Sequence, residues 1–324
     1  MVVDAEQTYS PVGPDEDALL RAFGTHPGAL LGSGGEARVF ALPDDATVLR
    51  LYAPTPEPHP LPLRPLLDSW VGVDLGFALP RILEVGRRGS QSWTIESRLP
   101  GIPLDRWLAD TPDADARHRA LVGFLDAAAR LQELPLPTPG FGRPWAPEER
   151  FDSLVDLLAA QVDVGLGLGG DALRERVPGL DARVAELLAR LAQRETTPRF
   201  VHGDLAPANV LVDTSGAVTA VLDFSVHALA ADPVLDLVGA VAFVELTPYP
   251  GRYADAARLQ PVLADRLGAD AWLIDAYRRF WALYYAMDPG LHPWCAAQFS
   301  TAPDLTRQQL TRTTRTDTSR LSGD

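Results

Sequence analysis

The sequence contains no lysine, only one cysteine and no long hydrophobic run. A single cysteine, Cys295, excludes an intramolecular disulfide, and no Cys/His cluster has the spacing of a zinc site. Without a run of about 18 apolar residues we expect no membrane span. The first residues also lack a basic region followed by an apolar block, so no secretory signal is visible and we expect a cytoplasmic protein.

Negative charge dominates the composition, with 43 acidic residues against 29 arginines and a formal net charge of −14. This balance argues against a nucleic-acid partner, which needs a basic surface. An acidic surface would attract a cationic substrate, but general acidity also serves solubility. The charge alone therefore does not select a substrate.

The most informative stretch runs from residue 201 to residue 224 and carries an acid, an amide and a second acid. Asp204 precedes Asn209 by five positions, and Asp223 heads an Asp-Phe pair further on. Protein kinases place their catalytic Asp, their metal-binding Asn and a metal-binding Asp in this order and with this first interval. In such an arrangement Asp204 takes the proton of an acceptor hydroxyl, while Asn209 and Asp223 supply oxygen ligands for Mg²⁺.

Short apolar segments surround these residues. Residues 210–212 and 218–222 have the pattern of two buried strands, and the segment from Asp213 to Gly216 between them forms turns readily. We therefore expect a hairpin that holds Asn209 and Asp223 on the same side of a cleft.

The opening His202-Gly203-Asp204, in place of His-Arg-Asp, resembles the aminoglycoside phosphotransferase family of small-molecule kinases. Residues 231–237, Ala-Asp-Pro-Val-Leu-Asp-Leu, are similar to another segment of that family. There Asp232 suits a helix N-cap and Pro233 its first turn. The resemblance implies that Asp236 reaches back to hold the backbone of the catalytic loop, and His202 is expected to brace that loop by hydrogen bonding.

The resemblance also implies a protein-kinase-like α+β fold with a small β-rich lobe, residues 1–98, and a larger helical lobe, residues 99–300. Residues 301–324 lack an apolar period, and we expect them to be disordered. A first helix is expected near residues 16–23. Periodic apolar residues predict further helices at 118–134, 151–162, 181–191, 256–267 and 272–287, with a glycine-rich turn at 165–170. Substrate selection is expected in the C-terminal helices, whose aromatic stripe is more typical of a core than of a pocket.

A glycine-rich segment near the N-terminus resembles the phosphate-covering loop of kinases, and its candidate nucleotide-binding residues are Gly32, Ser33, Gly34 and Gly35. Strands are expected at residues 38–42 and 47–52. Arg50 stands where kinases carry a lysine for the phosphates, and arginine can bind phosphate oxygens with two hydrogen bonds. No arginine occurs between Arg199 and Arg252, so Arg50 is the best candidate to balance the phosphate charge.

Residues 94–101 resemble the segment that joins the two lobes, and there Glu96 and Arg98 are candidates to meet the adenine edge. One departure from the family pattern concerns the glutamate that normally pairs with the strand cation. No glutamate occurs between Glu57 and Glu84, and Asp68 is the nearest substitute. This departure keeps a nucleotide-binding pseudokinase open as an alternative.

We expect Mg²⁺-dependent transfer of the γ-phosphoryl group of ATP or GTP to a hydroxyl of a small molecule, with an aminoglycoside-like or other antibiotic as the leading acceptor. Asp204 is the expected base, Asn209 and Asp223 the metal ligands, and Arg50 the phosphate clamp. A metabolic kinase for amino-alcohols, sugars or amino acids is the closer alternative.

Overall fold

The computed structural model describes residues 15–34, 37–54 and 63–300, and its contacts divide the chain into two compact units. The first unit comprises Met1–Ser153 and Thr196–Ala271, and the second comprises Leu154–Glu195 and Trp272–Asp324. Each unit is therefore built from two separate stretches of chain. The lobe boundary expected at residue 98 falls inside the first unit and stays a prediction, and the tail 301–324 lies outside the described residues.

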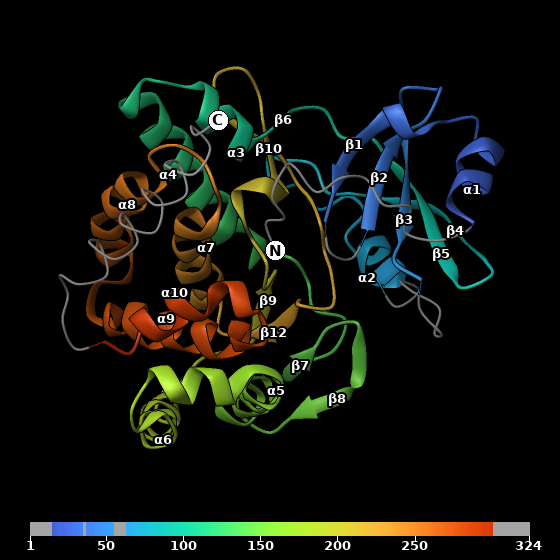
Figure 1. Cartoon of the computed structure of the whole chain (residues 1–324). Helices are drawn as coiled ribbons and strands as arrows, with labels where there is room; N and C mark the ends of the chain where they lie inside the picture. The colour runs from blue at the N-terminus through green and yellow to red at the C-terminus, as the bar shows by residue number, and fades with distance from the viewer. Residues whose placement is uncertain (1–14, 35–36, 55–62, 301–324) are drawn as a thin grey trace, which may run out of the picture. The chain divides into compact units, whose positions relative to one another are not determined.

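A five-stranded antiparallel sheet forms the N-terminal part of the first unit (Figure 1). Its strand order is β1-β2-β3-β5-β4, and the strands are β1 (Leu30–Ser33), β2 (Ala37–Ala41), β3 (Thr47–Tyr52), β4 (Ile82–Arg88) and β5 (Gln91–Ser97). Two short helices accompany it, α1 (Glu16–Ala22) and α2 (Leu63–Ser69), and η1 (Pro27–Ala29) precedes β1. The helix and the two strands expected from the sequence in this region are confirmed within one residue.

Alternation along β3 places Leu49 and Leu51 on one face of the sheet and Arg50, between Val48 and Tyr52, on the other. Leu49 and Leu51 are fully buried and pack with Leu20 of α1 and Phe40 of β2 in one core cluster. Arg50 points to the opposite face because successive strand residues alternate. The hydrophobic pattern thus fixes the side of the sheet from which the charged group projects.

In its described residues the first unit also contains two smaller sheets, one more short helix and three longer helices. The three-stranded sheet has the order β11-β10-β6 and the four-stranded sheet the order β8-β7-β12-β9. The strands are β6 (Ile102–Pro103), β7 (Phe141–Arg143), β8 (Ala146–Phe151), β9 (Arg199–Val201), β10 (Val210–Val212), β11 (Val218–Val221) and β12 (Leu229–Ala231). The helices are α3 (Leu104–Asp110), α4 (Ala114–Leu131), α7 (Val234–Leu246) and α8 (Arg252–Leu267), with 3-10 turns η2 (Pro207–Asn209) and η3 (Gly268–Asp270).

The expected hairpin is present as β10 and β11. Val210 pairs with Val221, and the amide of Leu222 donates to the carbonyl of Asn209 at 2.8 Å. Since this pairing closes the open end of the hairpin, Asn209 and Asp223 leave it at the same end. The helix after β12 begins at Val234, one residue later than expected.

The described residues of the second unit form four α-helices. α5 (Leu154–Arg176) and α6 (Leu180–Leu191) come from its first stretch of chain, and α9 (Trp272–Tyr284) and α10 (His292–Ala297) from its second. The turns η4 (Tyr285–Met287) and η5 (Pro289–Leu291) join the last two. Figure 1 shows α5 beside α6 in green and α9 and α10 in red. Tyr277, Phe280 and Trp281 are buried, so these members of the aromatic stripe belong to the core, as expected.

The glycine-rich turn expected at residues 165–170 is wrong, because these residues lie inside α5. A Cβ at Gly165 would overlap the carbonyl oxygens of Leu283 and Tyr284, and one at Gly169 would overlap that of Ala286. The glycines therefore let α5 approach the backbone of α9 and η4 closely. Glycine weakens a helix by about 1 kcal/mol relative to alanine, so packing must offset this cost here.

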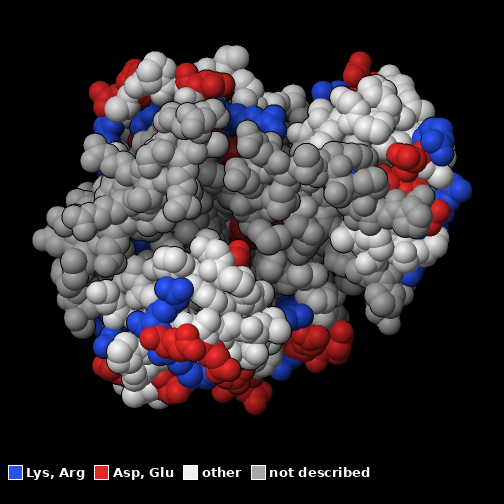
Figure 2. All heavy atoms as spheres, in the orientation of Figure 1, with Lys and Arg blue, Asp and Glu red and all other residues white. Residues whose placement is uncertain are grey.

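No helix among the described residues is both long and apolar enough to cross a membrane. At the surface, Figure 2 shows acidic and basic side chains next to one another in many places. Exposed ion pairs such as Arg258–Asp115 at 2.7 Å and Arg266–Asp126 at 2.6 Å are examples of this mixing. Part of the acidic side chains at the surface is therefore neutralised by neighbouring arginines.

Candidate active site

The loop between β9 and β10 has a backbone conformation that depends on glycine. Gly203 has a φ of +80°, and a Cβ at this position would overlap the backbone carbonyl of His227. His202 is fully buried beside it; its Nε2 donates to the carbonyl of Leu222 at 2.9 Å, and its Nδ1 accepts from the amide of Asp204 at 3.3 Å. His202 therefore braces the loop in the Nε2-protonated form, as expected.

Asp236 of α7 holds the same loop from the other side. Its carboxylate accepts from the amide of His202 at 2.6 Å and from the amide of Gly203 at 3.0 Å. Burial raises the pKa of Asp236, against the lowering effects of His202 and of these two hydrogen bonds. The expected role of Asp236 is confirmed. Asp232 is not the N-cap of α7, because Pro233 takes that position, but its Oδ1 accepts from the amide of Val234 at 3.1 Å.

Asp204 and Asn209 are brought together by the turn η2 between them. The amide nitrogen of Asn209 donates to the carbonyl of Asp204 at 2.8 Å and to its carboxylate Oδ2 at 3.4 Å. Because the nitrogen of the side-chain amide is used in this way, its oxygen is the atom that can bind a cation. The five-residue spacing in the sequence thus becomes direct contact between the proposed base and a proposed metal ligand.

Asp223 follows β11 in a left-handed conformation, with a φ of +60°. Asp and Asn adopt this region more readily than other non-glycine residues. Its carboxylate forms an ion pair and a hydrogen bond with the guanidinium of Arg50, which lies 173 positions earlier. Loss of hydration would raise the pKa of Asp223, but the charge of Arg50 and this hydrogen bond lower it below its ordinary value.

Arg50 is mostly buried, and its guanidinium lies over the ring of Tyr52 at 5.4 Å from the ring centre. Burial would lower the pKa of Arg50, yet the negative charges around it, above all Asp223, raise it well above its ordinary value. Asp68, the expected substitute partner, instead pairs with Arg64 at 3.7 Å on the surface of α2. The sequence alone did not reveal Asp223 as the partner of Arg50.

The candidate phosphate-covering residues lie at the end of β1. Gly32 and Ser33 belong to this strand, and the amide of Gly34 donates to the carbonyl of Ala37 at 2.9 Å. A Cβ at Gly32 or Gly34 would meet nothing within 4 Å, and neither residue has a positive φ. The fold itself therefore does not require glycine at these two positions. Gly35 lies outside the described residues.

Glu96 and Arg98 lie at the end of β5, where the chain leaves the sheet. Glu96 is buried and accepts a hydrogen bond from the hydroxyl of Thr94 at 2.6 Å. Arg98 pairs with Asp45 at 3.2 Å on the surface, and its amide donates to the carbonyl of Ala46. The side chain of Arg98 is thus engaged with the β2–β3 turn, and its role in nucleotide binding stays a prediction.

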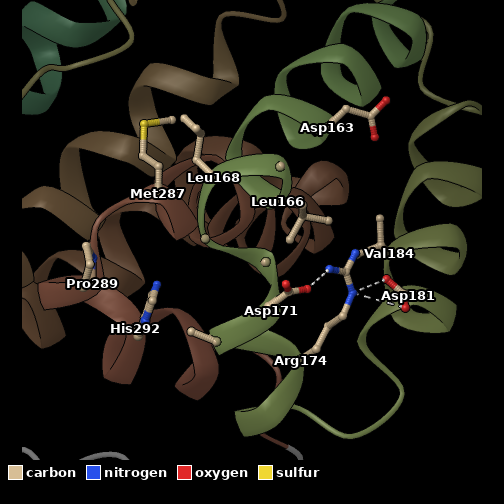
Figure 3. Close-up of a pocket in the computed structure, with 14 residues that line it drawn as sticks. Asp163, Leu166, Leu168, Asp171, Arg174, Asp181, Val184, Met287, Pro289 and His292 are labelled. Atoms are coloured by element: carbon tan, nitrogen blue, oxygen red, sulfur yellow. Dashed lines mark hydrogen bonds and ion pairs between the residues drawn. The ribbon is translucent and has the colours of Figure 1, made fainter.

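The second unit contains an open pocket of about 990 Å³ (Figure 3). Three of its charged lining residues form ion pairs, since Arg174 contacts Asp171 at 3.1 Å and Asp181 at 3.0 Å. None of the candidate catalytic, metal-binding or nucleotide-binding residues is among those that line this pocket. Within the described part of the chain, no group of three or more His, Cys, Asp or Glu side chains is arranged to hold a metal ion.

The contact of Asp204 with Asn209 and the pair of Arg50 with Asp223 lie in the same compact unit. The chain belongs to the phosphotransferase enzyme family (APH), whose family model matches residues 28–283. No curated protein matches its sequence.

Solved structures of aminoglycoside phosphotransferases share the fold. One is a thermostable mutant of APH(4)-Ia in a ternary complex with ADP and hygromycin B, with a TM-score of 0.66, 19% identity, and coverage of 88% of this chain and 96% of that chain. Another is APH(3'')-Id from Streptomyces rimosus with ADP and streptomycin, with a TM-score of 0.51, 22% identity, and coverage of 84% and 96%. The expected class is confirmed, with an antiparallel N-terminal sheet and a helical C-terminal part.

Proposed function

We propose that this protein transfers the γ-phosphoryl group of ATP or GTP to a hydroxyl of a small molecule, most readily an aminoglycoside-like antibiotic. The observation that carries the proposal is the contact between Asp204 and Asn209 at the same end of the hairpin as Asp223. Membership of the phosphotransferase family supports the reaction type. The ADP bound by the structural relatives supports a nucleotide donor. The aminoglycosides bound by the same relatives, together with the net charge of −14, support a cationic acceptor.

Asp204 is the proposed base. It accepts the proton of the acceptor hydroxyl as the bond from that oxygen to the γ-phosphorus forms and the bond from the phosphorus to the leaving diphosphate oxygen breaks. The hydrogen bond from Asn209 and the braced backbone at His202 hold its carboxylate in one place. Positioning of this kind supplies much of the catalysis, because phosphoryl transfer asks little covalent chemistry of the protein.

The residues fit the Mg²⁺ that the family implies. Asn209 has its amide oxygen available, Asp223 offers a carboxylate with a lowered pKa, and Mg²⁺ prefers one or two such oxygen ligands together with phosphate oxygens. Bound there, the ion would neutralise phosphate charge. Arg50 would bind phosphate oxygens through its planar guanidinium.

The test is a transfer assay with purified full-length protein. It would be incubated with Mg-ATP or Mg-GTP and a panel of aminoglycosides, other antibiotics, amino-alcohols, sugars and amino acids, and products would be sought by mass spectrometry. We expect phosphorylation of an aminoglycoside, and Asp204→Asn should lower the rate at least about 100-fold. Asp213→Asn, in the exposed turn of the same hairpin, is the matched control and should keep the rate.

Each result has a clear meaning. A phosphorylated amino-alcohol, sugar or amino acid without any antibiotic product would replace the acceptor class but keep the reaction. Binding of Mg-nucleotide with no product from the whole panel, or equal rates for Asp204→Asn and the parent, would contradict the proposal and favour a pseudokinase.

A further inference from the structure

Arg50 has two tasks that compete for its guanidinium, if the proposed function holds. In the structure it pairs with Asp223. In the proposed reaction Asp223 binds Mg²⁺ and Arg50 binds phosphate, so the direct pair has to loosen. A buried guanidinium that loses its acceptor is costly. Arg50 therefore needs a second carboxylate to keep it in place.

The helix α2 does not supply this carboxylate. Asp68 has a side chain that is 54% exposed and pairs with Arg64 on its own helix. An exposed carboxylate engaged within its own helix cannot orient a guanidinium that is only 14% exposed on β3.

The neighbouring strand does place a carboxylate on the right face. Arg50 is opposite Thr94, and Val48 is opposite Glu96, in the β3–β5 pairing. Residues two apart on a strand share a face, so Glu96 is the diagonal neighbour of Arg50, at a separation that long side chains can span. Glu96 is only 9% exposed. Thr94 lies directly opposite Arg50, and its hydroxyl donates to Oε1 of Glu96.

A further observation concerns the donor groups of Arg50. Its Nε is buried and makes no hydrogen bond to any of the described residues. The guanidinium thus has a donor that a carboxylate on the same face of the sheet can use.

We propose that Glu96 is the positioning residue of Arg50, in place of a carboxylate from α2, the helix that follows β3. Its buried carboxylate, oriented by Thr94, keeps the guanidinium aimed at the phosphates while Asp223 turns to the metal. The role of Glu96 is then exerted through its side chain on Arg50, and it differs from contact with the adenine edge.

The experiment is a double-mutant cycle on the full chain. The dissociation constant of Mg-AMP-PNP would be measured by calorimetry for the parent, Glu96→Gln, Arg50→Gln and the double variant. Glu96→Gln keeps the size of the side chain and an oxygen for Thr94. We expect it to raise the dissociation constant about fivefold in the parent but less than about twofold in the Arg50→Gln background. Asp68→Asn is the matched control and should stay within about twofold of the parent.

Melting temperatures measured without nucleotide or metal provide a second cycle. We expect the effects of Glu96→Gln and Arg50→Gln to be non-additive there too, because the two groups interact in the folded protein. If Glu96→Gln fails to fold, Glu96→Asp takes its place. It keeps the charge but shortens the side chain, and it should raise the dissociation constant only when Arg50 is present.

Equal effects of Glu96→Gln in both backgrounds would overturn the inference, since a merely structural role persists without Arg50. An effect of Asp68→Asn as large as that of Glu96→Gln would also overturn it. If the parent does not bind the Mg-nucleotide, this inference falls together with the proposed function. If it binds, the coupling is present and the transfer assay gives no product, the inference stands while the proposed function fails.

Discussion

The loop that carries Asp204 and the strand that carries Arg50 are held in different ways. The loop is fixed through its backbone, since two of its amides donate to Asp236 and its histidine bridges Asp204 and Leu222. Arg50 is held through its side chain, by an ion pair with Asp223. Backbone anchoring fixes one geometry, whereas an ion pair can exchange partners. Asp204, the proposed base, is therefore held in one geometry, whereas Arg50, the proposed phosphate clamp, can rearrange.

The largest effect should come from Asp236→Ala, which removes the anchor of the loop. Two buried amides, those of His202 and Gly203, would lose their acceptor. Each unsatisfied buried group costs about 1–3 kcal/mol, so we expect the free energy of unfolding to fall by about 3 kcal/mol and phosphoryl transfer to be lost. Urea denaturation and the transfer assay measure this. The exposed variant Asp213→Asn should keep the transfer rate. It should lower the free energy of unfolding by no more than about 1 kcal/mol, because its side-chain oxygen can still accept from the amides of Ser215 and Ala217. An unchanged stability of Asp236→Ala would show that the anchoring is dispensable.

A somewhat smaller loss is expected for Gly203→Ala. Alanine is strained at a φ of +80°, and its methyl group would collide with the carbonyl of His227. We expect a loss of about 2 kcal/mol in the free energy of unfolding, measured by urea denaturation. Gly123→Ala in α4 is the control, because its Cβ would enter open space. That change should stabilise the helix by up to about 1 kcal/mol.

Arg50→Gln tests the exchangeable side of the comparison. We expect it to raise the dissociation constant of Mg-nucleotide about tenfold, because a charge-assisted phosphate contact is lost. The free energy of unfolding should fall less than for Asp236→Ala or Gly203→Ala, and the loss should depend on pH. Since Arg50 lowers the pKa of Asp223, the stability from this pair is fully present above the ordinary aspartate pKa of about 4 and disappears as the pH falls through the lowered value.

Urea denaturation of parent and Arg50→Gln at pH 7 and near pH 3 checks this direction. The difference in their free energies of unfolding should shrink at the lower pH. A difference that grows on acidification would contradict the lowered pKa of Asp223.

The smallest effect on folding is expected for Gly34→Ala. This position has open space and an ordinary φ, so the free energy of unfolding should stay within about 0.5 kcal/mol of the parent. If the turn covers phosphates, the dissociation constant of Mg-nucleotide should still rise. The contrast with Gly203→Ala would separate glycine kept for a ligand from glycine kept for the fold. A strongly destabilised Gly34→Ala would remove that contrast.

Local signals predicted much of the fold and the catalytic side of the site. The interval between Asp204 and Asn209 and the turn at Asp213 act over a few residues, so the hairpin and the loop that carries the proposed base could be anticipated. The pairing of Arg50 with Asp223 spans 173 positions and depends on how β3 meets the end of β11. Strand alternation could have placed Glu96 on the face of Arg50, but only once the pairing of β3 with β5 was known.

The wrong turn at residues 165–170 has a related cause. Glycines weaken a helix locally, and a sequence pattern registers that weakness. What outweighs it is the close approach to carbonyls near Leu283 and Ala286, more than 100 residues further on. A tertiary contact at that distance leaves no trace in the local pattern.

The close packing of α5 also has a consequence for folding during synthesis on the ribosome. A helix rich in glycine gains little from its own propensity, and its partner backbone in α9 and η4 is made only after residues 196–271 have been added. At roughly 5–20 residues per second the ribosome needs about 4–15 s for that interval. During this time the first half of the second unit waits without its counterpart, and the apolar face of α5 is exposed to chaperones and to neighbouring chains. The apolar face of α5 is then covered only when the C-terminal helices have been synthesised and have packed against it.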